Sequence, residues 1–83
     1  MPVAHDIQEQ LSKLDQQIIV LLEQRIAICG EALEEDEEAL GTEHVAEAVG
    51  EWEAAADERG WNLNVMSKLC RVIIELCKSA AQE

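Results

Sequence analysis

The sequence predicts an all-helical protein built from one long helix followed by two shorter ones. Apolar residues recur in steps of three and four along three segments, which is the periodicity of helices that bury one face. The chain has two Trp, no Phe and no Tyr, so its core must use Leu, Ile, Val, Ala, Cys and Met, most of which are good helix formers. The 83 residues are expected to form one domain, residues 1–83. A domain this small buries only a modest fraction of its surface alone, so a partner subunit is expected to help.

The first helix is expected to begin at Asp6, which makes a variant capping box with Glu9, and to run toward Leu40. Its seam of apolar residues consists of Ile7, Leu11, Leu14, Ile18, Leu21, Ile28 and Ala32. A second stripe consists of Ile19, Leu22, Ile26, Cys29 and Leu33. Two adjacent stripes indicate a helix that packs against neighbours on two sides. Arg25 fills the one seam position that is not apolar, where a packed helix favours leucine.

Five consecutive acidic residues, Glu34 to Glu38, follow the stripes. They are interpreted as a solvated helical surface or a linker. They lack the alternating ligands and central glycine of a calcium-binding loop, so no metal site is expected. Because no Gly or Pro interrupts the chain before Gly41, the helix is expected to continue to that glycine, unless the acids form a loop, and to reach ~50 Å. A rod of this length cannot fold its own halves together and invites a second chain.

The second helix is expected to have Thr42 as its N-cap and to end at Gly60. Its apolar positions are Val45, Val49, Trp52 and Ala56. Either Asn62 or Asn64 is expected to cap the third helix. The apolar positions of that helix are Met66, Leu69, Ile73, Leu76 and Ala80, widened by Val65, Cys70, Val72, Ile74 and Cys77. This breadth predicts a mostly buried helix.

The charge balance and the cysteines exclude several classes of protein. Eighteen acidic and six basic residues give a formal charge of −12, which repels phosphate backbones and anionic lipid, so neither nucleic acid nor a membrane is an expected partner. No apolar run approaches the ~18 residues of a membrane span, and the first residues do not resemble an export signal. The three cysteines form no C-x-x-C pair and are interpreted as buried thiols of a reducing compartment. We therefore expect a cytoplasmic protein with no metal and no cofactor.

Two segments resemble the all-helical (type II) chorismate mutases. The first is LDQQIIVLLEQR, from Leu14 to Arg25, and the second is LCRVIIE, from Leu69 to Glu75. The order and lengths of the expected helices are also similar, so the resemblance covers nearly the whole chain. It implies a chorismate mutase type II-like fold and an intertwined homodimer. In such a dimer the two long helices pack along each other, and each active site is a polar pocket inside the bundle.

The reaction implied by the resemblance is the rearrangement of chorismate to prephenate, which needs no metal, cofactor or covalent intermediate. Catalysis rests on holding a dicarboxylate in its reactive shape and placing positive charge or donors beside its ether oxygen. Arg25 stands where the family keeps a carboxylate-binding arginine, and a guanidinium pairs bidentately with carboxylate. The structural alternative is that Arg25 forms a salt bridge with Glu23, Asp15 or a carboxylate of a partner chain.

Most other pocket positions of the family are substituted in this chain. Gln8 stands where the family has an arginine contributed across the dimer, and Asp36 stands where it has a lysine. His44 and Val45 replace an arginine and an acid. Cys77 and Ala81 replace polar residues, and Gln82 lies beside Ala81. Loss of one preorganised donor typically costs ~3 to 4 kcal/mol of transition-state stabilisation. Asp36 would in addition repel a dianion. These residues do not describe an efficient mutase.

Three hypotheses follow from the sequence. The first is a chorismate mutase-like dimer with little or no mutase activity, which acts as a binding or interaction module and keeps Arg25 for a small carboxylate or as a structural group. The second is a divergent chorismate mutase, or a related isomerase on a small carboxylate substrate, that combines Arg25 with donors from other residues. The candidate donors are Gln8, His44, Lys13 and Gln82. The third is an unrelated helical bundle or acidic scaffold. No catalytic nucleophile is assigned, since buried thiols are mostly inert.

Overall fold

The computed structural model describes the backbone of residues 3–81 and the side chains of residues 6–81. This part of the chain contains three α-helices and no strand: α1 spans Val3–Glu35, α2 spans Thr42–Arg59 and α3 spans Leu63–Ala81. The all-helical class and the order of one long and two shorter helices are therefore confirmed. No helix among these residues is long and apolar enough to cross a membrane.

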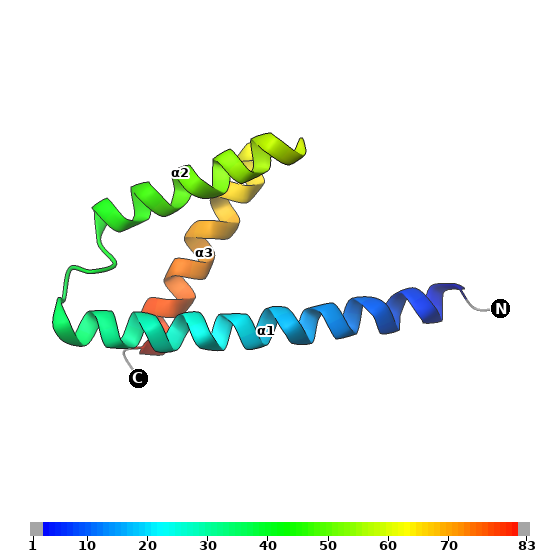
Figure 1. Cartoon of the computed structure of the whole chain (residues 1–83), viewed down its shortest axis with the longest axis horizontal. Helices are drawn as coiled ribbons and strands as arrows, with labels where there is room; N and C mark the ends of the chain where they lie inside the picture. The colour runs from blue at the N-terminus through cyan, green and yellow to red at the C-terminus, as the bar shows by residue number, and fades with distance from the viewer. Residues whose placement is uncertain (1–2, 82–83) are drawn as a thin grey trace.

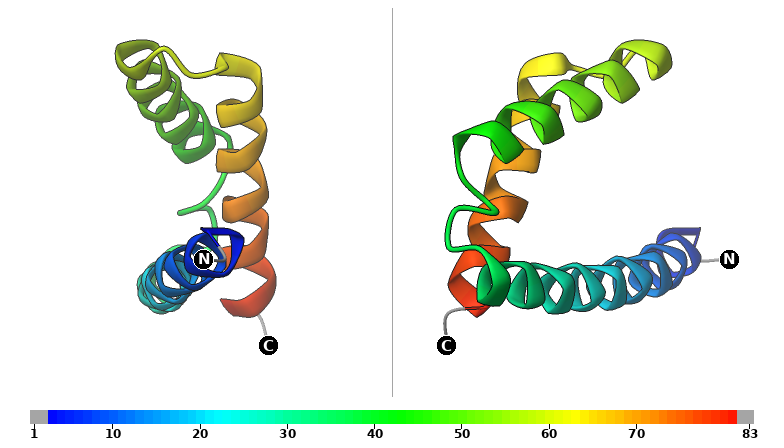
Figure 2. Two further views of the ribbon diagram at one scale, coloured as in Figure 1. Left: turned by 90° about the vertical axis from the view of Figure 1, so that its right-hand side faces the viewer. Right: turned by 60° about the vertical axis from the view of Figure 1, so that its left-hand side comes forward.

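The three helices form an open arrangement with α3 at its centre (Figure 1). α3 packs against the C-terminal part of α1 and against α2, whereas α1 and α2 diverge and do not pack on each other. The N-terminal half of α1 projects as a free arm, as the two rotated views in Figure 2 show. The molecule measures 54 × 30 × 14 Å along its principal axes, and the arm accounts for much of its longest dimension.

The start of α1 differs from the prediction. The helix already includes Val3, so Asp6 lies in the first turn and does not act as the N-cap. Its carboxylate still lies near the positive end of the helix dipole, which is a favourable place for an acid. The 33 residues of α1 span ~50 Å at 1.5 Å per residue. The predicted length is thus reached with a helix that begins, and also ends, earlier than the sequence indicated.

Two further predictions, on the end of α1 and the N-cap of α2, differ from the structure of the linker between these helices. α1 ends at Glu35 and not at Gly41, so the acidic run is divided between the last helical turn and a loop. The Asp36 carboxylate accepts a hydrogen bond of 3.0 Å from the backbone N–H of Glu38, and local bonding of this kind competes with helix continuation. Gly41 occupies the N-cap position of α2 without any side-chain hydrogen bond, and Thr42 is the first helical residue. Thr42 is therefore not the cap.

The structure of the junction between α2 and α3 agrees with the prediction from the sequence. Gly60 follows α2 in the left-handed conformation, with φ of 72°, which glycine adopts without the steric penalty of a side chain. Asn62 then caps α3, because its Oδ1 accepts a hydrogen bond of 3.0 Å from the backbone N–H of Val65. The end of the second helix at Gly60 is confirmed, and of the two asparagines considered the structure selects Asn62 over Asn64.

Two small buried clusters hold the helices together. The first joins α2 to α3 and consists of Ala48, Val49, Cys70 and Ile74, with Val45 and Trp52 packed against it. The second joins α1 and the linker to α3 and consists of Cys29, Leu40 and Cys77, with Ile26, Leu33 and Ile73 packed against it. The C-terminal members of the second stripe of α1, Ile26, Cys29 and Leu33, thus pack within the chain, whereas Ile19 is 51% exposed. Both clusters are built mainly from small and medium side chains, so the free energy gained by apolar burial in a single protomer is modest.

The apolar seam of α1 is uncovered in the protomer. Its members Ile7, Leu11, Leu14, Ile18, Leu21 and Ile28 are 49–67% exposed. α3 has an uncovered face as well, at Val65, Leu69, Val72 and Leu76, which are 43–60% exposed. The expectation that the third helix is mostly buried is therefore wrong for the single protomer. Its buried side is narrower, because only Cys70, Ile74 and Cys77 of α3 are buried.

Candidate functional site

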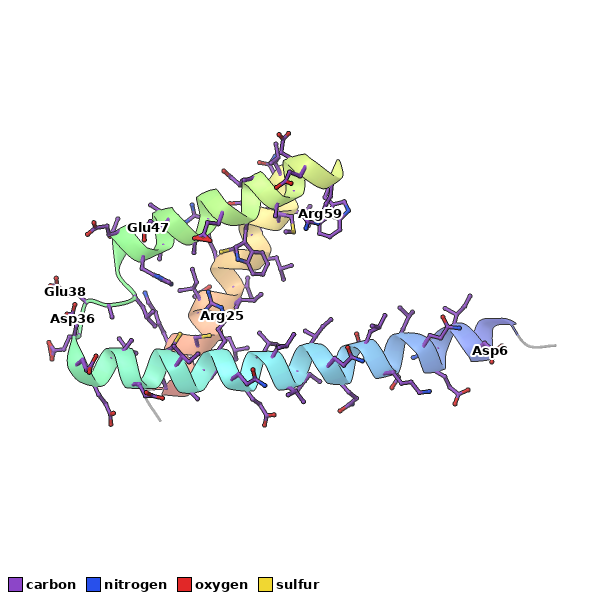
Figure 3. All side chains as sticks on the ribbon, viewed as in Figure 1. Asp6, Arg25, Asp36, Glu38, Glu47 and Arg59 are labelled. Carbon is purple, nitrogen blue, oxygen red and sulfur yellow. The ribbon has the colours of Figure 1, made fainter. Side chains whose placement is uncertain are left out.

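Arg25 lies where α1 meets α3. Its side chain rises from α1 into the angle between the two helices (Figure 3) and is partly buried. The Nη1 group donates a hydrogen bond of 3.3 Å to Sγ of Cys77 on α3 and a longer one of 3.9 Å to Sγ of Cys29, one turn along α1. The Arg25 guanidinium therefore lies between two helices of the same chain.

Within residues 6–81 the Arg25 guanidinium makes no salt bridge. Its hydrogen bonds in this part of the chain go to two sulfur atoms, which are weak acceptors. Pairing with Glu23 or Asp15, the structural alternative considered for this residue, is not observed. A partly buried guanidinium with such partners keeps most of its capacity to bind an anion, since its five donors are suited to carboxylate or phosphate oxygens.

The thiols around Arg25 are buried and reduced. Cys29, Cys70 and Cys77 are all free cysteines. Burial raises the pKa of Cys29, with a further rise from its hydrogen bond to Cys77, against an opposing effect of Arg25. Burial also raises the pKa of Cys70, again opposed by Arg25. Arg25 thus favours the thiolates of Cys29 and Cys70, and Cys77, one of the substituted family positions, is its nearest polar contact.

Two other predicted positions lie far from Arg25 in the protomer. Gln8 is exposed on the free arm of α1, 17 residues before Arg25, which corresponds to ~25 Å along the helix. Asp36 lies exposed in the linker, at the opposite end of α1 from the arm (Figure 3). Within one chain the structure therefore does not bring Gln8 or Asp36 to the guanidinium.

The remaining predicted residues are divided among different places. His44 lies in the first turn of α2, where its Nε2 atom is buried and has no hydrogen-bond partner among the described residues. Ala81 lines a hollow of about 380 Å³ together with Gly30, Leu33, Glu34 and Glu37. Gln82 lies outside the described residues. The structure gives no common pocket to Arg25, His44 and Ala81.

A second group of cations was not singled out from the sequence. Arg71 and Lys78 of α3 line a groove of about 420 Å³ with Gly41, Thr42, Val45 and Ala46 at the start of α2. Their spacing could have identified this pair from the sequence, because residues seven apart lie on the same side of a helix. The groove is open and Glu75 lines its continuation, so a carboxylate accompanies these two cations, in contrast to the surroundings of Arg25.

The binding chemistry available to Arg25 is electrostatic. Among the described residues no group of three or more His, Cys, Asp or Glu side chains is placed to hold a metal ion. Arg25 offers a positive charge and several donors at a partly dry position, which suits binding of an anion. No protein-family model, curated protein or solved structure matches the chain, so the function has to be inferred from the molecule itself.

Proposed function

We propose that this chain is one half of an intertwined homodimer of the chorismate mutase type, which binds a small carboxylate through Arg25 and has little or no mutase activity. The observation that carries the proposal is the state of Arg25. Its guanidinium is partly buried, points into the joint between α1 and α3 and, within the described residues, donates hydrogen bonds to sulfur atoms only. Holding a charge there costs desolvation free energy, which an incoming carboxylate offsets.

The uncovered seam of α1 supports the homodimer. Burial of a Leu or Ile side chain stabilises by ~1.5 to 3 kcal/mol, and six such side chains are 49–67% exposed along the seam of α1. In a symmetric pairing of two arms each of these side chains is buried in both copies, so its contribution to the dimer is made twice. The exposed face of α3 adds apolar surface that an intertwined partner covers.

The distribution of charge supports the same pairing. Residues 6–25 carry four acidic and two basic side chains, whereas residues 31–58 carry twelve acidic side chains and no Lys or Arg. The strong negative charge is therefore concentrated away from the seam. Two copies can align their arms with little repulsion, and the acidic linker and α2 remain at the periphery, where water and salt screen them.

The substituted positions argue against efficient catalysis. Catalysis of the chorismate rearrangement needs several preorganised donors, each worth ~3 to 4 kcal/mol when removed. In this chain Cys77 lies beside Arg25, where a sulfur is a weak donor, and Asp36 is held in the linker by its bond to Glu38. Gln8 is able to contribute only from a partner arm. Arg25 alone is enough to bind a carboxylate, but not to stabilise the transition state fully.

Chorismate is the probe that tests the proposal. We expect the wild-type protein to bind it in a calorimetric titration and Arg25→Ala to bind it ~10- to 150-fold more weakly, which corresponds to a charged hydrogen bond of ~1.5 to 3 kcal/mol. Arg59→Ala is the matched control, because Arg59 is exposed and lies over the Trp61 ring at 5.7 Å from its centroid. This control should bind like the wild type.

Prephenate formation, followed in the same samples, separates the two functions. The proposed binding module forms prephenate no faster than the Arg25→Ala protein. Turnover by the wild type that is lost in Arg25→Ala would support the alternative, a divergent chorismate mutase. Equal affinity of wild type and Arg25→Ala for chorismate would overturn the carboxylate site and leave the acidic helical scaffold as the interpretation.

A further inference from the structure

The joint between α1 and α3 contains a pair of thiols that share one cation. Cys29 on α1 and Cys77 on α3 each accept a hydrogen bond from the same Nη1 atom of Arg25, at 3.9 and 3.3 Å. They belong to the same buried cluster, and Cys29 is 5% and Cys77 0% exposed.

The two helices approach closely at this point. Gly30 follows Cys29 directly, and a Cβ atom built on Gly30 would lie 3.9 Å from the Cβ of Ala81, one turn beyond Cys77 on α3. Small side chains at a helix crossing allow the backbones to come together, and a disulfide needs Cα atoms within about 7 Å. The surroundings of the pair therefore favour a direct bond between the two sulfur atoms.

We propose that Cys29 and Cys77 form a redox-sensitive dithiol, which a hydroperoxide converts into a disulfide that links α1 to α3 within one chain. The Arg25 guanidinium is the group at this joint that favours the attacking thiolate, because a neighbouring cation stabilises it, against the opposing effect of burial. This inference does not depend on the carboxylate-binding function, since it concerns the sulfur atoms and not a ligand.

The reaction balances with hydrogen peroxide as the co-reactant. One thiolate attacks a peroxide oxygen, the O–O bond breaks, hydroxide leaves, and a sulfenic acid forms. The second sulfur then attacks the sulfenic sulfur, the S–S bond forms, and the oxygen departs as water. In total two thiols lose two protons and two electrons, and one peroxide becomes two molecules of water.

The consequence follows from the architecture. α1 touches α3 but does not pack on α2, and the joint cluster around Cys29, Leu40 and Cys77 is small. A covalent bond at this place fixes the angle of the long arm relative to the rest of the protomer. Oxidation therefore acts on the element that carries the uncovered seam.

Peptide mapping tests the proposal, because trypsin separates the three cysteines. Cleavage after Lys and Arg places Cys29 in peptide 26–59, Cys70 in peptide 69–71 and Cys77 in peptide 72–78. The folded full-length protein is reduced, desalted, exposed to hydrogen peroxide, and then alkylated in denaturant before digestion. We expect peptides 26–59 and 72–78 to be joined, with two hydrogen atoms lost, and Cys70 to carry the alkyl group.

Cys70 is the matched internal control, since it is as buried as Cys77 and lies on the same helix. Cys70→Ser should leave the cross-link unchanged. Arg25→Met should slow formation of the cross-link by about tenfold, because loss of the neighbouring cation lowers the fraction of thiol that is ionised. An equal share of Cys70 in the disulfides, a link between two copies on a non-reducing gel, or cysteines that all remain alkylated would overturn the assignment. An unchanged rate in Arg25→Met would overturn the role of the guanidinium.

Discussion

Arg25 of α1 donates a hydrogen bond of 3.3 Å to the sulfur of Cys77 on α3, across 52 positions of sequence. This bond crosses the joint between the two helices. A sulfur acceptor offsets only part of the desolvation of a guanidinium. The arginine is thus held at a position where an apolar side chain of similar length would fold at least as well.

We therefore expect Arg25→Met to leave the stability unchanged or to raise the free energy of unfolding by up to ~1 kcal/mol, since replacing poorly paired buried charges by apolar groups is often neutral or stabilising. Urea denaturation at fixed protein concentration measures the change. A loss of more than ~2 kcal/mol would mean that the bonds to sulfur are strongly stabilising, and Arg25 would then be explained by structure alone.

The seam of α1 leads to a prediction about association. Leu14 is 53% exposed in the middle of the arm, and Leu14→Asp would place a charge at that point in both copies of a dimer. Each lost leucine contact is worth ~1.5 to 3 kcal/mol, so the dimer should dissociate at least ~100-fold more readily. Sedimentation equilibrium measures this change.

Gln24→Asp is the matched control for Leu14→Asp. It introduces the same charge on the same helix, and helical periodicity places Gln24 about 80° away from Leu14, on the polar side. This variant should associate like the wild type. A wild-type protein that sediments as a monomer at all concentrations, or two variants with equal effects, would contradict the proposed arrangement of the arms.

The helical order was predictable because it depends on local chemistry. Gly60 ends α2 because glycine adopts the left-handed conformation without a steric penalty, and Asn62 caps α3 through its side-chain oxygen. The end of α1 was predicted less well, since five consecutive acids fit a helix and a loop equally. The deciding interaction is the bond from Glu38 to the Asp36 carboxylate, which depends on backbone geometry that residue spacing does not give.

The candidate site was predictable only in part. The interruption of an apolar seam by a cation singled out Arg25, whose guanidinium lies in the joint between α1 and α3 of one chain. Which of the two stripes packs within the chain depends on the angle at which α3 crosses α1, so the sequence did not separate Cys29, which is buried, from Ile28, which is 67% exposed. The contact between Arg25 and Cys77 is a tertiary one for the same reason.

The two asparagines near the start of α3 provide a test of its cap. Asn62→Ala removes the acceptor for the Val65 N–H and should lower the free energy of unfolding by about 1 kcal/mol. Asn64→Ala is the matched control, since Asn64 is exposed, lies inside the first turn and makes no capping bond among the described interactions. It should change the stability by less than ~0.5 kcal/mol. Equal losses in the two variants would contradict the assignment of the cap.

The glycine that follows α2 and the glycine in its interior should respond to alanine in opposite directions. Gly60→Ala places a side chain at φ of 72° and should lower the free energy of unfolding by ~1 to 2 kcal/mol. Gly50→Ala, in the helix interior, should raise it by ~0.5 to 1 kcal/mol. A Cβ atom meets nothing within 4 Å at either position, so the contrast isolates backbone conformation. Denaturation midpoints that shift in the same direction would contradict it.

The buried thiol of Cys70 should make the stability of the protein depend on pH in the alkaline range. Burial raises the pKa of its thiol above the ordinary value of 9.0, so the folded state disfavours the thiolate. Its contribution to stability is complete below that pH and is lost as the pH rises through the folded-state pKa. Above about pH 9 the free energy of unfolding should therefore fall more steeply for the wild type than for Cys70→Ala. Urea denaturation with a reductant present measures both slopes. Parallel slopes would mean that the thiol ionises as easily in the folded chain as in the unfolded one, and that Cys70 is less well buried in solution than its place between α2 and α3 requires.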